Sequence, residues 1–99
     1  MRDILNSART ATAELRQLFE PTPLQRNEHL SLTYGADIWL KREDLTPVRS
    51  YKIRGAMNFF RAHLARGGAA DRFVCASAGN HAQGFAHVCR ALGLHGTVF

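Results

Sequence analysis

Apolar residues recur every three to four positions in three parts of the chain, and this spacing predicts three amphipathic α-helices. The first helix covers residues near 3–19 and ends before Pro21. Ser50 is a predicted N-cap for the second helix, which ends at Gly67, and Gly93 ends the third. The predicted buried stripes of the second and third helices are Ile53, Ala56, Met57, Phe60 and Leu64, and Ala82, Phe85, Ala86, Cys89 and Leu92.

The segments between these helices predict one shorter helix and three strands. Residues 28–34 have a helical pattern, with Asn27 as a predicted N-cap and Gly35 positioned for the left-handed conformation after the last turn. The predicted strands cover residues 37–42, 73–76 and 96–99. The first alternates with a period of two, whereas the second is a continuous apolar run, which is typical of a strand buried on both faces.

From residue 37 onward the predicted order is strand, helix, strand, helix, strand. This alternation favours the α/β class, with a parallel sheet, right-handed crossovers and helices on both faces of the sheet. Residues 1–35 then form leading helices, and residues 36–99 form a βαβαβ unit. The apolar pattern is still running at Phe99, and three parallel strands alone leave apolar faces and a strand edge open. We therefore expect a truncated fold, the N-terminal part of a longer domain.

Composition and charge exclude several classes of function. Of the 99 residues, 45% are hydrophobic and 21% charged, as in folded globular chains. The net charge is +5, but the arginines are scattered and no basic run alternates with aromatic residues, so nucleic acid is not an expected partner. No stretch is apolar enough to cross a membrane, and the N-terminus lacks the apolar core of a secretion signal, which predicts a cytoplasmic protein.

Metal sites, disulfides and nucleotide loops find little support in the residue spacing. No cysteine or histidine pair has the spacing of metal ligands, so no metal is expected. Cys75 and Cys89 are interpreted as reduced core residues. Gly79 and Gly84 have the spacing of a nucleotide-binding P-loop, but Phe85 stands where that motif requires lysine.

Two turns at the predicted carboxyl ends of strands are candidates for chemistry, because open α/β sheets bind ligands there. Residues 77–81 are small and polar and open a helix, so their free N–H groups suit a carboxylate or phosphate. A helix cap without a ligand explains the same composition. Lys52 lies in the other turn, near a helix N-terminus, where the macrodipole disfavours a charged amine and suits Schiff-base chemistry. A solvated surface lysine is the alternative interpretation.

Three segments carry a resemblance to a known family: LKREDL at residues 40–45, SYKIRGA at residues 50–56 and ASAGNHAQG at residues 76–84. In this order they resemble the pyridoxal-phosphate enzymes of the tryptophan-synthase-β fold type, and among these most of all the biosynthetic threonine dehydratases. Residues 22–24, Thr-Pro-Leu, fit the same family. The resemblance covers nearly the whole chain.

The resemblance implies roles for named residues. Lys52 would bind pyridoxal 5′-phosphate covalently, and Asn80 would hydrogen-bond the ring oxygen of the cofactor. The residues implied to receive the substrate carboxylate are Ser77, Ala78, Gly79, Asn80 and His81. The implied reaction is deamination of L-threonine to 2-oxobutanoate and ammonia, a step of isoleucine synthesis, by an enzyme that self-associates as a homo-oligomer.

Two parts of the family's site are not in this sequence, and two alternatives stay open. The glycine-rich loop for the cofactor phosphate and the partner of the pyridine nitrogen lie further along in this family, so the 99 residues alone are expected to bind cofactor weakly without turnover. A serine dehydratase or serine racemase is the nearest alternative, because one methyl group distinguishes the substrates weakly. A non-catalytic module that binds a partner through the strand edge at residues 96–99 is the alternative from a different class.

Overall fold

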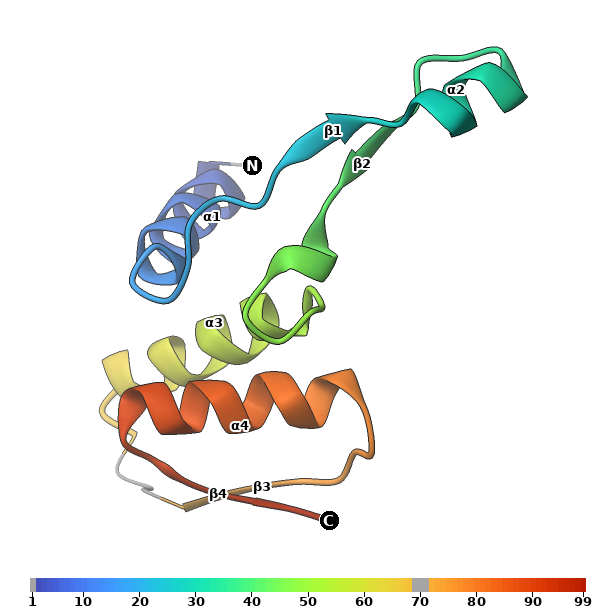
Figure 1. The fold of residues 1–99 in the computed structure, drawn as a ribbon. Coiled ribbons are helices and arrows are strands. Elements are labelled where there is room, and N and C mark those ends of the chain that lie inside the picture. The colour runs from blue at the N-terminus through green and yellow to red at the C-terminus, as the bar shows by residue number, and fades with distance from the viewer. Residues whose placement is uncertain (1, 69–71) are drawn as a thin grey trace.

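The computed structural model describes residues 2–68 and 72–99, which form helices, short strands and one turn of 3-10 helix (Figure 1). In chain order the elements are α1 (Arg2–Leu15), β1 (Leu24–Arg26), α2 (Glu28–Tyr34), β2 (Trp39–Lys41), η1 (Glu43–Leu45), α3 (Lys52–Ala65), β3 (Arg72–Cys75), α4 (Asn80–Leu92) and β4 (His95–Val98). Within these ranges, no helix is both long and apolar enough to cross a membrane.

The core lies where α3 and α4 pack against each other and against one face of the strands β3 and β4. Phe60 is at its centre, because its ring centroid lies 4.8 Å from that of Phe73 on β3 and 5.7 Å from that of Phe85 on α4. Both contacts fall in the range of favourable aromatic pairs. The other large, fully buried apolar side chains are Ile53, Met57 and Val88.

The predicted stripes describe the buried helix faces with one error. The α3 stripe is confirmed by burial of Ile53, Ala56, Met57 and Phe60. On α4, Phe85 and Cys89 are buried as predicted, but Ala86 is exposed and Val88 is buried instead. Positions 85, 88 and 89 lie on one side of a helix, and α3 packs against that side. The prediction for Ala86 was wrong because this contact, not composition, selects the face.

The helix α1 ends earlier than its apolar pattern predicts. The pattern continues to residue 19, whereas the helix ends at Leu15. Beyond Leu15 the backbone includes a hydrogen bond between residues three apart instead of four, because the N–H of Leu18 donates to the carbonyl of Leu15 at 2.9 Å. The chain then turns through residues 16–19, and the half-buried Phe19 packs against the core cluster.

The strands β3 and β4 form a parallel pair, in the register Arg72↔His95 to Cys75↔Val98. Side chains alternate along β3, so Phe73 and Cys75 face the helices, whereas Val74 is 72% exposed. The α/β class and the parallel pairing are therefore as predicted. Burial of this strand on both faces is not seen, because among the described residues the helices cover one face only (Figure 1).

The first predicted strand does not join that sheet, which corrects the expectation of three parallel strands. β2 pairs instead with β1 in an antiparallel ladder, with Gln25 opposite Leu40. The ladder extends at both ends, because Asn27 N–H donates to the Ile38 carbonyl and Arg42 N–H donates to the Pro23 carbonyl, each at 2.9 Å. A local antiparallel partner needs only a short connection, and α2 supplies it. Residues 1–35 thus contain a strand as well as helices.

We call residues 24–41 the arm, because β1, α2 and β2 project away from the helices α3 and α4 (Figure 1). Its helix has the predicted ends: the Asn27 side chain accepts from Leu30 N–H at 2.8 Å, and Gly35 has φ 60°. The Cα radius of gyration is 16.3 Å, above the roughly 13 Å expected for a compact chain of this length. The projecting arm accounts for the difference.

Candidate active site

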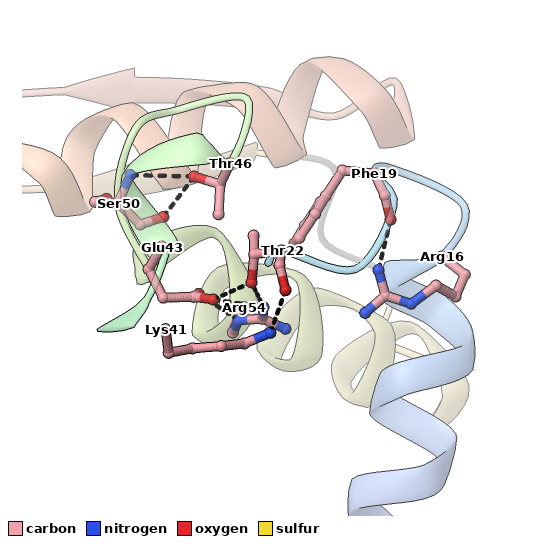
Figure 2. A network of polar contacts seen from close by, with 8 residues as sticks. All are labelled: Arg16, Phe19, Thr22, Lys41, Glu43, Thr46, Ser50 and Arg54. Atoms are coloured by element: carbon pink, nitrogen blue, oxygen red, sulfur yellow. Dashed lines mark hydrogen bonds and ion pairs between the residues drawn. The ribbon is translucent and has the colours of Figure 1, made fainter. Parts of the chain in front are cut away.

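Lys52 is the first residue of α3, and a hydrogen-bonded loop precedes it. The buried hydroxyl of Thr46 donates to the Ser50 carbonyl at 2.7 Å and accepts from the Ser50 N–H at 3.1 Å (Figure 2). Ser50 is therefore not the N-cap that its residue type predicts, because its backbone is bound to Thr46 and Tyr51 occupies the cap position without a side-chain hydrogen bond. Arg49, with φ 62°, adopts the left-handed conformation that non-glycine residues rarely take. These hydrogen bonds fix the backbone of residues 46–50, which lead into α3.

A cavity of about 600 Å³ adjoins the start of α3. Its volume is within the range of small-molecule sites, about 300–1,000 Å³. Its polar lining residues are Tyr51, Lys52, Arg54 and His81. Its apolar lining includes four phenylalanines, namely Phe59, Phe60, Phe73 and Phe85. The Lys52 ammonium group lies 5.2 Å from the ring centroid of Tyr51 and makes no hydrogen bond to the described residues. The cavity therefore combines one primary amine with large apolar surfaces.

The second predicted turn forms the start of α4. Gly79 precedes the helix, its N–H donates to the Ser77 hydroxyl oxygen at 3.2 Å, and Asn80 is the first helical residue. Of the five predicted carboxylate-binding residues, His81 lines the cavity together with Lys52. Ser77, Ala78, Gly79 and Asn80 are not part of its lining. The structure thus joins the two turns at one cavity through a single residue of the second.

Gly84 explains why the two turns lie together. A Cβ atom on this residue would lie 3.0 Å from the carbonyl carbon of Lys52 and 3.1 Å from the nitrogen of Ile53. Both neighbours are backbone atoms, so α4 approaches the start of α3 so closely that any larger residue would require this backbone to shift by a few tenths of an ångström. The GxxxxG spacing in the sequence pointed to a glycine of interest, but its function is helix packing.

Four polar groups from four segments meet beside the start of α3 (Figure 2). Glu43 of η1 accepts two hydrogen bonds from the Arg54 guanidinium, Nε to Oε2 at 2.6 Å and Nη2 to Oε1 at 2.8 Å. The Thr22 hydroxyl donates to Glu43 Oε1 at 2.6 Å, and the Lys41 ammonium donates to the Thr22 carbonyl at 2.5 Å. We call these four residues the junction, because they connect the arm to α3. The sequence alone gave no partner for Glu43 or Arg54.

The pKa of Glu43 is lowered from 4.5 to about 2, chiefly by the hydrogen bonds from Arg54, with further contributions from Thr22 and Lys41. Because this value lies below that of the unfolded chain, ionised Glu43 stabilises the fold above about pH 4.5, and the contribution is lost as the pH falls toward 2. We expect urea midpoints of the wild type and Glu43→Gln to converge over this interval. A difference between the two proteins that stays constant down to about pH 2 would contradict the assignment.

The thiols and the histidines other than His81 form no further site among the described residues, and of the two thiols Cys75 lines the cavity. Cys75 and Cys89 are free and buried, and burial raises the pKa of the Cys89 thiol. In residues 2–68 and 72–99, no group of three His, Cys, Asp or Glu side chains is close enough to hold a metal ion.

Comparison with known proteins gives a consistent result. The family model described as pyridoxal-phosphate dependent enzyme matches residues 15–99. The chain is 52% identical over 89 residues to the biosynthetic L-threonine dehydratase IlvA of Mycobacterium tuberculosis, covering 90% of this chain and 20% of the relative. It is 54% identical over 78 residues to the Bacillus subtilis enzyme of the same name, covering 79% and 18%. The chain therefore spans about a fifth of the length of these curated relatives.

Solved structures agree with the sequence matches. Threonine deaminase isoform 2 of Solanum lycopersicum superimposes with a TM-score of 0.80 at 32% identity, covering 98% of this chain and 27% of that one. Maize serine racemase superimposes with a TM-score of 0.83 at 27% identity, covering 94% and 29%. Both are similar to this chain over almost its whole described length.

Proposed function

Because this chain belongs to the family of pyridoxal-phosphate dependent enzymes, we propose that Lys52 binds the cofactor and that the parent enzyme deaminates L-threonine to 2-oxobutanoate and ammonia. The observation that carries the proposal is the location of Lys52, at the start of α3 and in the lining of the cavity. We further propose that residues 1–99 are the N-terminal part of the catalytic domain. In this scheme residues 1–35 lead into it and residues 36–99 carry both turns.

The residues around the cavity fit a pyridoxal group. A flat aromatic ring needs an apolar cleft and one amine for covalent attachment, and the cavity offers phenylalanine surfaces and the Lys52 amine. Gly55 adds to the space, because no atom lies within 4 Å of a Cβ built there. Asn80, the first residue of α4, is outside that lining but adjacent in sequence to His81, which belongs to it, and Asn80 is our candidate for hydrogen bonding to the ring oxygen.

The chemistry requires an amine that exchanges a proton with the substrate. When bound, pyridoxal phosphate supplies a ring that stabilises negative charge on the α-carbon of an attached amino acid. We propose that the amine of Lys52, the first residue of α3, accepts the α-proton of threonine. The β-hydroxyl then leaves with a proton as water, and hydrolysis returns one water to give the oxo acid and ammonia.

We propose that the turn at residues 77–81 receives the substrate carboxylate. The first backbone N–H groups of an α-helix have no carbonyl acceptor within the helix. They point out of its N-terminus, where the helix dipole favours an anion such as a carboxylate. His81 brings this turn to the same cavity as Lys52. Holding the carboxylate would fix which bond at the α-carbon faces the lysine amine.

L-Serine is the second candidate substrate, and the similarity to maize serine racemase favours it. The two amino acids differ by one methyl group, which an apolar pocket distinguishes by roughly 10–200-fold. Comparing kcat/KM for L-threonine and L-serine in the parent enzyme separates the two candidates.

We further propose that the parent enzyme self-associates and that it is located in the cytoplasm.

Reductive labelling tests the role of Lys52 directly. The purified chain is mixed with pyridoxal phosphate, reduced with borohydride and digested, and the labelled lysine is identified by peptide mass. Only Lys41 and Lys52 are available, and Lys41 already donates to the Thr22 carbonyl. We expect the label on Lys52, its loss in Lys52→Arg, and its retention in the matched control Lys41→Arg. Equal labelling of both lysines, or of neither, would contradict the proposal.

A further inference from the structure

We propose that Glu43 and Arg54 are positioning residues, which hold the first turn of α3 so that the Lys52 amine is directed into the cavity. This inference rests on the proposed function, because it assigns a purpose to the direction of Lys52. Neither residue is proposed to react, and both act through the backbone that they fix.

The start of α3 lacks the usual means of fixing a helix end. Its N-cap residue, Tyr51, makes no side-chain hydrogen bond to the first turn, and the predicted cap, Ser50, is bound to Thr46 instead. Such caps ordinarily contribute about 1 kcal/mol to a helix. Another interaction has to hold this turn if Lys52 is to keep one direction.

The Glu43–Arg54 pair has the geometry to hold it. Arg54 lies two residues after Lys52, and a guanidinium that binds a carboxylate through two parallel hydrogen bonds is fixed in both distance and plane. Thr22 further constrains the carboxylate, and the guanidinium carbon lies 5.4 Å from the ring centroid of Phe19. The first turn of α3 is thus attached to segments more than ten residues earlier in the chain.

The charges around the turn lead to the same conclusion. Lys52 and Arg54 are both cations at the positive end of α3, where the helix dipole and their mutual repulsion favour fraying. Glu43 neutralises Arg54, and only 21% of its side chain is exposed, so water screens the pair less than it screens a surface pair. Removing the carboxylate leaves two unneutralised cations on one turn.

A neighbouring ion pair provides a matched control. Arg42 and Asp44, the two sequence neighbours of Glu43, also form two hydrogen bonds with each other, at 2.9 and 2.7 Å. Both belong to the same short segment, so this pair does not reach α3, and 57% of the Asp44 side chain is exposed. Asp44→Asn therefore breaks a similar interaction without releasing the Lys52 turn.

The experiment measures Lys52 labelling by pyridoxal phosphate and borohydride together with amide hydrogen exchange in α3 and α4. For Glu43→Gln we expect about tenfold less Lys52 label, the effect of losing a charged hydrogen bond, and faster exchange confined to residues 52–56. Arg54→Gln removes the two parallel hydrogen bonds to Glu43 and adds no lysine that the label could modify, and we expect it to behave like Glu43→Gln. Asp44→Asn is expected to resemble the wild type in both measurements.

Two results would overturn the positioning role. One is that Lys52 is labelled in Glu43→Gln as strongly as in the wild type. The other is that amide exchange in Glu43→Gln becomes faster throughout α4 to the same degree as Lys52 labelling falls, because this would indicate a general loss of stability. If the wild type itself shows no Lys52 label, the proposed function fails. Amide exchange in residues 52–56 then still decides whether the pair holds the turn, because it requires no cofactor.

Discussion

Replacing Phe60 by alanine is expected to remove a large part of the stability of the chain. Its side chain is 1% exposed, and its ring contacts Phe73 and Phe85, so truncation leaves a cavity between α3, α4 and β3. Such substitutions cost about 3–5 kcal/mol. A chain of 99 residues has a total free energy of unfolding on the order of 5–15 kcal/mol. Urea unfolding followed by far-ultraviolet circular dichroism measures the loss.

Phe59→Ala is the matched control, because it removes the same ring one position earlier in the same helix. Phe59 is 57% exposed, so its truncation creates no enclosed cavity. We expect a change of less than about 1 kcal/mol, the usual range of surface substitutions. Equal losses in the two variants would show that the core is not centred where the aromatic contacts indicate.

Replacing Gly84 by valine is expected to separate α4 from the start of α3 and to destabilise the chain by about 3 kcal/mol. The nearest obstacles to a new side chain are backbone atoms of Lys52 and Ile53, which no rotamer change can move. The helices must therefore shift, and the shift displaces Lys52 relative to His81. We expect a lower urea midpoint and loss of Lys52 labelling by pyridoxal phosphate.

Gly55→Ala provides the comparison for Gly84→Ala, since both glycines lie inside helices. No atom lies within 4 Å of a Cβ at Gly55, so alanine there is expected to stabilise α3 by up to about 1 kcal/mol. The same change at Gly84 meets the Lys52 backbone and is expected to destabilise the chain. Two changes of the same sign would show that helix propensity, not the close contact, governs position 84.

Local sequence signals predicted the elements well. The α2 helix has the predicted ends, because Asn27 and Gly35 act through hydrogen bonds and backbone angles within a few residues of themselves. The α3 stripe was predictable because a 3.6-residue period places Ile53, Met57 and Phe60 on one side whatever the partner is. The family resemblance likewise depended on residue order, and the comparisons confirm it.

What the sequence did not predict depends on contacts between distant segments. The pairing of β2 with β1 was missed because strand patterns do not specify a partner. Ser50 was predicted as a cap from its residue type, although the Thr46 hydroxyl competes for its backbone. The contact of Gly84 with Lys52 and the pairing of Glu43 with Arg54 require α3, α4 and η1 to be assembled first.

The projecting arm decides what an optical experiment on this chain reports. The chain has one tryptophan, Trp39, which lies on β2 and is 55% exposed, away from the buried face of α3 and α4. Its fluorescence therefore follows the environment of the arm, whereas the ellipticity of the long helices follows the core. Separately stable parts of a protein open at different free energies. Emission intensity alone would accordingly measure the release of residues 24–41 and miss the state of the cavity that contains Lys52.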